Sequence, residues 1–191
     1  SFNMVSVDGD TSTNDTLAVM ASGLAGNAEI TEQNEDYNIF VEAFTILCRK
    51  LSKEMAKDGE GASKLLVCKV SGAKTEKDAK GVAKSVVCSS LLKAAMFGSD
   101  ANWGRVLCAI GYSGCDVDIN KVDVSFASKA GKVDVCKNGA GIDFSEEIAK
   151  TVLTEDESDI VVELNDGNGV AEAYGCDLTY EYVKINGDYR S

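Results

Sequence analysis

The chain has 191 residues, 45% of them hydrophobic, and a formal net charge of −12, from 19 Lys plus Arg against 31 Asp plus Glu. This length and composition predict one globular domain with both helices and strands, and exclude a disordered or fibrous protein. The negative charge argues against a nucleic-acid partner, because phosphate binding needs a concentrated positive face. No apolar run approaches the roughly 20 residues that span a bilayer, so we expect a cytoplasmic protein with no membrane partner.

The histidine and cysteine content narrows the chemistry. The chain contains no His, which removes the commonest general base and the commonest zinc ligand. A Ser-His-Asp triad or a Cys-His dyad therefore cannot be assembled from this chain alone. The seven Cys are scattered and form no CxxC pair, which favours reduced thiols in the core over disulfides. We expect neither a bound metal nor a cofactor.

The N-terminal part opens with an alternating segment, residues 2–7, which predicts a short strand. A polar octapeptide, "DGDTSTND" (residues 8–15), follows it. The next segment, 16–26, is helix-like until its glycines end it. The simplest interpretation is a buried polar turn in which Thr13 or Asn14 caps that helix.

Two ligand-binding interpretations of residues 8–15 are weaker. The alternation of Asp8 and Asp10 resembles the start of an EF-hand, but the sixth and twelfth positions hold Thr13 and Val19 instead of Gly and Glu. A phosphate cradle would need several glycines and usually a Lys ahead of the helix, whereas the octapeptide has a single Gly. We therefore favour a structural role for this segment.

A long amphipathic helix is predicted over residues 37–57, where large apolar side chains recur every three or four positions. These side chains form the apolar stripe, which we expect to pack in the core: Phe40, Phe44, Leu47, Leu51 and Met55. The segment "DGEGASK" (58–64) ends this helix with a glycine-bearing turn. Its Glu60 is either a solvated charge at a helix end or a carboxylate that recognises a cationic amino group.

The middle of the chain predicts a strand followed by helices. Residues 64–72 are apolar and strand-like, and Thr75 caps a helix predicted over 76–98. A polar cluster, "SDANWGR" (99–105), precedes a further helix. Its Trp103 is either a large core residue or part of a packed turn that fixes an ion pair.

The C-terminal part has more strand character. Residues 122–139 predict a hairpin that turns at Ala130 and Gly131, and residues 145–153 predict a short helix. Glycine-bearing turns separate three strand candidates within 159–191. No linker or repeat divides the chain, so we expect a single domain.

Six stretches together resemble the β subunit of the ornithine acetyltransferase family, also called glutamate N-acetyltransferases. In chain order they are "SVDGDTSTNDT", "NEDYNIFVEAF", "DGEGASK", "FGSDANWGR", "YGCDLTYEYV" and "KINGDYRS". The departures are small: the family usually has Pro at Ala101, often Thr at Ser63 and Ser191, and commonly Ala at Gly187. The resemblance implies an α+β fold, the αββα layered sandwich of this family and of self-processing aminopeptidases.

The resemblance implies an enzyme of arginine biosynthesis that is made as one precursor and cuts itself before a Thr. The freed Thr heads the β subunit as the nucleophile, and its own α-amine can act as the base in place of His. Acetyl passes from N-acetylornithine to the Thr and then to glutamate in a ping-pong cycle, and some members also accept acetyl-CoA. The implied partner is the α chain of the same precursor, in an α2β2 heterotetramer.

The same motifs imply which residues bind substrate. Glu60 of "DGEGASK", Asn186 of "KING" and the terminal Ser191 correspond to substrate-binding residues of the family. An amino acid offers an ammonium to a carboxylate, and its carboxylate accepts from amide and hydroxyl donors. The Thr nucleophile is expected upstream of Ser1, so residues 1–191 should be a β-subunit portion that lacks its first segment and is inactive alone.

Two other functions stay open from the sequence. A related self-processing amidohydrolase or aminopeptidase would use water in place of glutamate as the acceptor. A non-enzymatic acidic domain that binds calcium through residues 8–15 is the remaining alternative.

Overall fold

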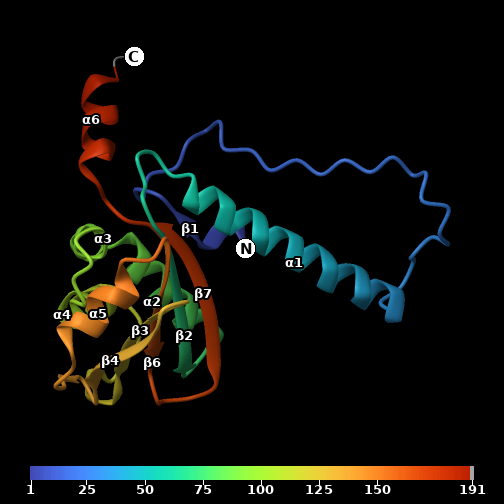
Figure 1. Cartoon of the computed structure of the whole chain (residues 1–191). Coiled ribbons are helices and arrows are strands. Elements are labelled where there is room, and N and C mark those ends of the chain that lie inside the picture. The colour runs from blue at the N-terminus through green and yellow to red at the C-terminus, as the bar shows by residue number, and fades with distance from the viewer. Residues whose placement is uncertain (190–191) are drawn as a thin grey trace.

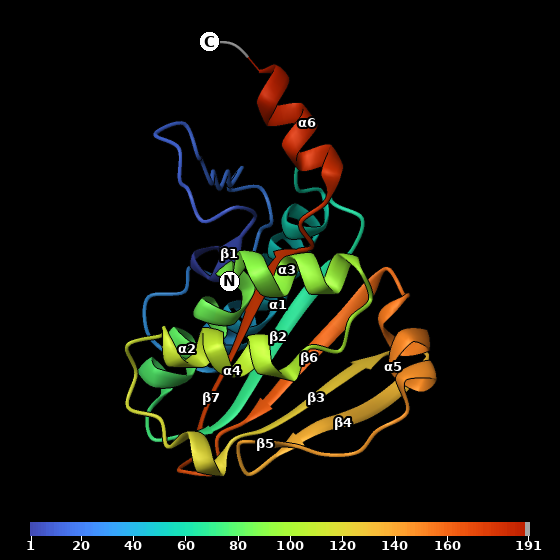
Figure 2. The ribbon, with the colours of Figure 1, turned by 90° about the vertical axis from the view of Figure 1, so that its left-hand side faces the viewer.

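The computed structural model describes residues 1–189, and its centre is a seven-stranded sheet with the order β1-β7-β2-β6-β3-β4-β5 (Figures 1 and 2). The strands of this part of the chain are β1 (Val5–Ser6), β2 (Leu65–Ala73), β3 (Asp123–Ser128), β4 (Gly131–Lys137), β5 (Ala140–Gly141), β6 (Glu157–Glu163) and β7 (Gly169–Cys176). Strand β2 is parallel to β6 and antiparallel to β7. The sheet is therefore mixed.

Helices cover both faces of this sheet unequally. They are α1 (Glu35–Lys57), α2 (Glu76–Cys88), α3 (Ser90–Phe97), α4 (Trp103–Gly111), α5 (Glu146–Leu153) and α6 (Tyr180–Asp188), with short 3-10 turns at Phe2–Met4 and Ile119–Lys121. Helices α2 to α5 lie on one face, α1 lies behind the other, and α6 extends away from the body (Figure 2). A side-chain oxygen caps the start of each α-helix, from Asn34, Thr75, Ser89, Asn102, Ser145 and Thr179 in turn.

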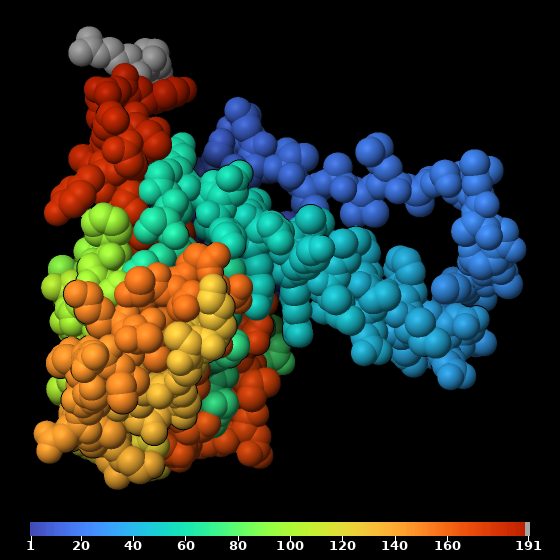
Figure 3. All heavy atoms as spheres, in the orientation of Figure 1, coloured from blue at the N-terminus to red at the C-terminus, as the bar shows by residue number. Residues whose placement is uncertain are grey.

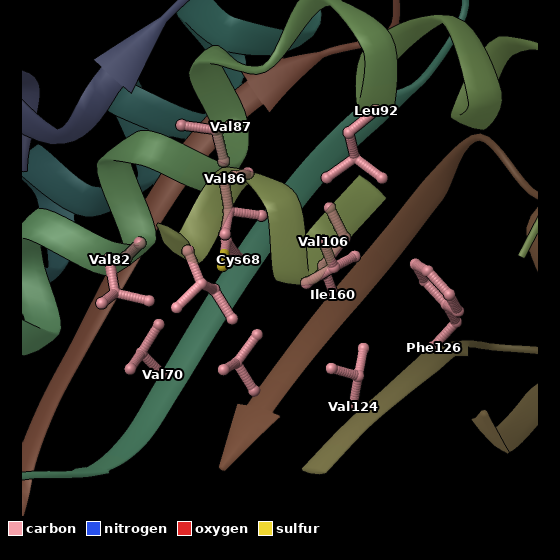
Figure 4. Close-up of a cluster of buried hydrophobic side chains, with 14 of the residues drawn as sticks. Cys68, Val70, Val82, Val86, Val87, Leu92, Val106, Val124, Phe126 and Ile160 are labelled. Atoms are coloured by element: carbon pink, nitrogen blue, oxygen red, sulfur yellow. The ribbon is translucent and has the colours of Figure 1, made fainter. Parts of the chain in front are cut away.

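The main core lies between helices α2 to α5 and the sheet (Figure 4). Strand β2 points every second side chain toward it, so Leu66, Cys68 and Val70 are at most 3% exposed. Val82 and Val86 of α2 belong to the same cluster and are fully buried. Each such side chain stabilises the fold by about 1.5–3 kcal/mol relative to exposure.

The second face of the sheet is polar where α1 does not cover it. Lys69 of β2 donates to Asp159 of β6 at 2.6 Å, and Ser71 donates to Glu163 at 2.5 Å. Tyr174 of β7 is instead buried in a small cluster with the end of α1. One face of the sheet is apolar and buried and the other is partly polar, which fits the alternation of apolar and polar side chains along its strands. The predicted α+β layered fold is confirmed.

Strand register determines where the two ends of the site meet. Leu65, the first residue of β2, pairs with Cys176, the last residue of β7. The segment that precedes β2 and the segment that follows β7 therefore leave the sheet at the same end. The first of these is "DGEGASK" and the second leads into α6, which carries "KING".

The helix predicted over residues 16–26 is wrong, because this segment has no regular secondary structure. It belongs to an extended arm that leaves the body after β1 and joins the start of α1 away from the body, so that α1 leads the chain back (Figures 1 and 3). Leu17, Met20 and Leu24 are 57%, 95% and 87% exposed. A helix this short depends on packing of its apolar face, and no other part of residues 1–189 covers these side chains.

The apolar stripe does not lie in the core, contrary to the prediction. Helix α1 is confirmed, but Phe40, Leu47, Leu51 and Met55 are 44–57% exposed. The first half of α1 projects past the body (Figures 1 and 3). The buried residues of the helix, Cys48, Ser52 and Ala56, all lie in its second half. A 3.6-residue period predicts an apolar face, but it does not say which surface covers that face.

Smaller differences concern the boundaries of elements. The helix predicted over 76–98 is two helices, because Ser89 is extended and caps α3. The N-terminal strand is only β1, and the third strand expected within 159–191 is α6. The hairpin is confirmed as β3 and β4, but its turn residues are Lys129 and Ala130, since the residues on either side of them pair. Helix α5 is also confirmed.

The cysteines are free thiols, as predicted. Cys48, Cys68, Cys136 and Cys176 are buried, whereas Cys108 is exposed. In residues 1–189, no group of three or more His, Cys, Asp or Glu side chains is arranged to hold a metal ion. None of the described helices is long and apolar enough to cross a membrane.

Candidate functional site

The Glu60 loop (residues 58–64) joins α1 to β2 and packs against the first turn of α6. Gly61 in this loop has a φ of +65°, a conformation that favours glycine. A Cβ atom on Gly61 would lie 2.6 Å from the backbone nitrogen of Tyr182 in α6. The loop can approach the helix this closely because residue 61 has no side chain.

This contact brings together two of the three predicted substrate-binding residues. Asn186 Nδ2 donates to Glu60 Oε2 at 2.8 Å, although 126 residues separate them along the chain. Both side chains are exposed. Glu60 is therefore not an isolated charge at a helix end. The third predicted residue, Ser191, lies outside the described residues.

The hydrogen bonds of Asn186 determine which atoms of the pair stay available. Its amide nitrogen also donates to the backbone carbonyl of Tyr182 at 3.1 Å, so both amide hydrogens are used. The carboxylate of Glu60 only accepts, which fixes the orientation of the amide. Within residues 1–189, no donor reaches Glu60 Oε1 or Asn186 Oδ1. The pair thus presents two acceptor oxygens.

Thr179 joins the Glu60 loop to α6 through one hydroxyl. Its Oγ1 donates to the carbonyl of Gly61 at 2.6 Å and accepts from the backbone nitrogen of Tyr182 at 3.2 Å. It is the N-cap residue of α6 and is 6% exposed. An N-cap hydroxyl typically stabilises a helix by about 1 kcal/mol.

Asp177 holds the other end of the Glu60 loop. Its carboxylate accepts from the backbone nitrogens of Ser63 and Lys64, at 2.8 and 2.9 Å, and from the Ser63 hydroxyl at 2.5 Å. Asp177 is only 2% exposed. Three hydrogen bonds compensate for removing this carboxylate from water.

Lys64, the last residue of the Glu60 loop, carries a positive charge and is only 8% exposed. Its Nζ donates to the carbonyls of Met96 and Leu153, in the last turns of α3 and α5, and to the Ser99 hydroxyl, at 2.7–2.8 Å. An ammonium is favourable at helix C-termini, where the backbone dipoles end negative. Burial lowers the pKa of Lys64, and the charge of Asp177 opposes this effect.

Sequence reasoning missed Lys64, Asp177 and Thr179 as parts of the site. The sequence predicts Lys64 only as the last residue of the "DGEGASK" turn and the first residue of a strand. The available signal was a charged residue directly beside the apolar run "LLVC", which places it at the edge of a core. Asp177 and Thr179 lie within one of the six family stretches, but no local pattern assigns them to the Glu60 loop.

The polar octapeptide, residues 8–15, reaches the site through Asp8. The hydroxyl of Tyr182 donates to Asp8 Oδ2 at 3.0 Å. Burial raises the pKa of Tyr182, and this hydrogen bond and the charges of Asp8, Glu60 and Asp10 raise it further. Asp8 and Glu60, which are far apart in the sequence, therefore bond Tyr182 and Asn186, which lie one turn apart on the same face of α6.

The predicted cap by Thr13 or Asn14 is wrong, because no helix follows them. The octapeptide is also exposed instead of buried. Its polar side chains bind its own backbone: Asp8 Oδ1 accepts from the nitrogen of Asp10 at 3.1 Å, and Ser12 Oγ accepts from that of Asn14 at 3.1 Å. The polar turn is retained without the helix it was expected to begin.

Trp103 belongs to the structural frame. Its half-buried ring packs against the main core and covers Gly141 of β5, where a Cβ atom would lie 2.4 Å from it. Arg105 donates to the carbonyl of Leu91 at 2.7 Å. Among the described residues no carboxylate pairs with Arg105, so the core interpretation of Trp103 is the correct one.

Comparison with solved structures identifies the class of fold. The chain superposes on a crystal structure of the arginine biosynthesis bifunctional protein ArgJ from Bacillus halodurans with a TM-score of 0.93 and 47% sequence identity. The match covers 99% of this chain and 87% of that one. The ArgJ family matches residues 1–191. The chain belongs to the ArgJ family, which confirms the resemblance drawn from the six stretches.

Curated relatives are similar along the whole chain. Arginine biosynthesis bifunctional protein ArgJ 1 from Clostridium acetobutylicum is 54% identical over 191 residues, which are 100% of this chain and 47% of that protein. The corresponding protein from Caldanaerobacter subterraneus is 51% identical over 190 residues, again 47% of its length. The chain spans about half the length of the curated relatives it matches.

Proposed function

We propose that this chain is the β-subunit portion of an acyltransferase that moves acetyl from N-acetylornithine to glutamate in arginine biosynthesis. Membership of the ArgJ family supports this assignment. The observation that carries it furthest is the hydrogen-bonded pair of Glu60 and Asn186, in which two family motifs meet at one exposed place.

In the proposed reaction the nucleophile is a Thr hydroxyl outside this chain. It attacks the acetyl carbonyl of N-acetylornithine, the amide C–N bond breaks, and ornithine leaves with the transferred proton. The amine of glutamate then attacks the acetyl ester, the bond from acetyl to the Thr oxygen breaks, the proton lost by the amine returns to that oxygen, and N-acetylglutamate leaves. No bound cofactor is needed, because acetyl travels on the Thr. We propose acetyl-CoA as a further donor, since its thioester can be attacked in the same way.

We propose that Glu60 and Asn186 bind the α-nitrogen of the substrate. Their free atoms, Glu60 Oε1 and Asn186 Oδ1, are both acceptors, so they fit an N–H donor better than a carboxylate. The α-nitrogen is common to both substrates, whereas the side chain of ornithine is cationic and that of glutamate is anionic. A fixed acceptor pair can serve both halves of the cycle only through the shared group. Ser191 is proposed as a further substrate contact.

Glu60→Gln in the complete protein is expected to lower kcat/KM by about 10- to 100-fold for N-acetylornithine and for glutamate, the cost of losing a hydrogen bond to a charged group. Steady-state acetyl transfer measures both values. Glu181→Gln is the matched control, because this exposed carboxylate pairs with Lys184 on its own helix and should change kcat/KM less than twofold.

Three results would argue against this assignment. Unchanged kinetics in Glu60→Gln would remove Glu60 from the site. Hydrolysis of N-acetylornithine without transfer to glutamate would favour an amidohydrolase. A defect confined to N-acetylornithine would show that the pair recognises the ornithine side chain instead of the α-nitrogen.

We propose the α chain of the same precursor as the partner, in an α2β2 assembly. The apolar stripe of α1 is exposed in this chain, and exposed apolar surface of this kind marks a contact with another chain. The relatives are about twice as long as this chain, so a second chain of similar size is available to cover it. We also propose that the assembly works in the cytoplasm, since the cysteines of this chain are unpaired, as in reducing compartments.

Leu47→Asp, in the middle of the apolar stripe, is expected to abolish co-purification of the α chain, because a buried unpaired charge costs several kcal/mol. Lys50→Asp, on an exposed part of the same helix, should leave co-purification unchanged. Size-exclusion chromatography with light scattering measures the assembly. If both variants retain the α chain, the stripe is not the contact with that chain. If this chain instead forms a homodimer that Leu47→Asp disrupts, a second copy of the chain covers the stripe.

A further inference from the structure

We propose that Thr179 is a positioning residue for substrate binding, whose hydroxyl sets the separation between Glu60 and Asn186. This inference rests on the proposed function, because it takes these two side chains as the substrate-binding pair. Thr179 itself is buried, and its hydroxyl bonds both the Glu60 loop, at Gly61, and α6, at Tyr182.

The need for positioning comes from the geometry of α6. This helix extends away from the body (Figure 1), and no residue from Tyr180 to Asp188 is buried. Asn186 lies seven residues after Thr179, about two helical turns or 10 Å farther along the axis of α6. Small changes at the first turn of α6 therefore move Asn186 by larger amounts. The direction of the helix depends on what holds that first turn.

Thr179 Oγ1 is the atom that links this turn to the Glu60 loop. It bonds Gly61, the residue after Glu60, and Tyr182, the residue four positions before Asn186. The carbonyl of Tyr182 in turn accepts from Asn186 Nδ2, which also donates to Glu60. These bonds close a ring from the loop, through the hydroxyl and the helix, back to the loop. Removing the hydroxyl opens the ring at its base.

Asp177 has a different role, although it lies two residues away. It binds Ser63 and Lys64, at the end of the loop that enters β2. These bonds fix the loop to the sheet but do not reach α6. Thr179 is therefore the residue whose loss should alter the geometry of the pair while the loop stays attached to the sheet.

Thr179→Val in the complete protein tests this inference, because Val keeps the shape and removes the hydroxyl. We expect KM to rise about tenfold for both N-acetylornithine and glutamate, with kcat changed less than twofold. Thr179→Ser retains the hydroxyl and should restore both KM values. Thr151→Val in α5, an exposed threonine whose hydroxyl bonds its own helix, is the matched control and should leave them unchanged.

A double-mutant cycle separates positioning from general destabilisation. In an Asn186→Ala background the pair is already lost, so Thr179→Val should raise KM less than twofold further. Three results would overturn the inference and leave the proposed function standing, as long as acetyl transfer and the effect of Asn186→Ala are observed. They are a full, multiplicative rise of KM on adding Thr179→Val to Asn186→Ala, no restoration of KM by Thr179→Ser, and an unchanged KM in Thr179→Val. Absence of acetyl transfer in the unmodified protein, or an unchanged KM in Asn186→Ala, would overturn the proposed function and this inference together.

Discussion

Replacing Lys64 with methionine is expected to lower the free energy of unfolding by about 3–5 kcal/mol, the cost of breaking a buried charged network. The variant keeps most of the aliphatic volume but leaves the carbonyls of Met96 and Leu153 without their donor. It also removes the positive charge that interacts with buried Asp177. Chemical denaturation of the complete protein measures the change. Lys77→Met, at an exposed position of α2, is the control, and a loss below about 1 kcal/mol in Lys64→Met would show that Lys64 is dispensable.

Lys64 also predicts a pH dependence of stability. Burial lowers its pKa in the folded chain below the ordinary value of 10.5. Between those two pKa values the unfolded chain binds a proton that the folded chain has released, so the free energy of unfolding rises with pH in that window. The difference between the unmodified protein and Lys64→Met should therefore increase as pH approaches 10.5. A difference that falls with pH would mean that the pKa is raised.

Gly61→Ala is expected to lower kcat/KM at least about 100-fold, because displacements of about 1 Å in a site can have effects of this size. Its Cβ atom would lie 2.6 Å from the nitrogen of Tyr182 and 2.8 Å from the carbonyl carbon of Glu181. The backbone φ of +65° adds strain of about 1–2 kcal/mol for a residue with a side chain. The Glu60 loop and α6 must then separate, which parts Glu60 from Asn186.

The control for this variant is Gly187→Ala in α6. A Cβ atom at Gly187 meets nothing within 4 Å, so this substitution should leave kcat/KM unchanged and should not destabilise the helix. Steady-state kinetics of both variants, with thermal unfolding in parallel, make the comparison. Wild-type kinetics in Gly61→Ala would show that the close approach of loop and helix has no role in the site.

Several elements were predictable because their causes are local. Thr75 and Ser145 cap helices where the sequence indicates, since a hydroxyl can satisfy the free amides of a first turn. The alternating valines of β3 and β4 form the predicted hairpin. The carboxylate and amide of the site, Glu60 and Asn186, were named from family motifs. In each case a few neighbouring residues carry the information.

The wrong predictions share a different cause. The segment 16–26 has a helical composition but no surface to pack on, so it stays extended. The apolar stripe marks α1 correctly but lies outside the core of this chain. The last predicted strand became α6 because Thr179 caps a helix there. A pattern indicates which face is apolar, and only the tertiary structure decides what lies against it.

The sequence by itself determined the family, the helices with strong caps, the hairpin, and the identity of two residues proposed to bind substrate. The tertiary structure decided that those two residues meet, because pairing of Leu65 with Cys176 places the ends of β2 and β7 together. It also decided which of their atoms stay free, since the amide hydrogens of Asn186 are already bonded. Contacts across 126 residues depend on strand register and packing, which no local propensity encodes.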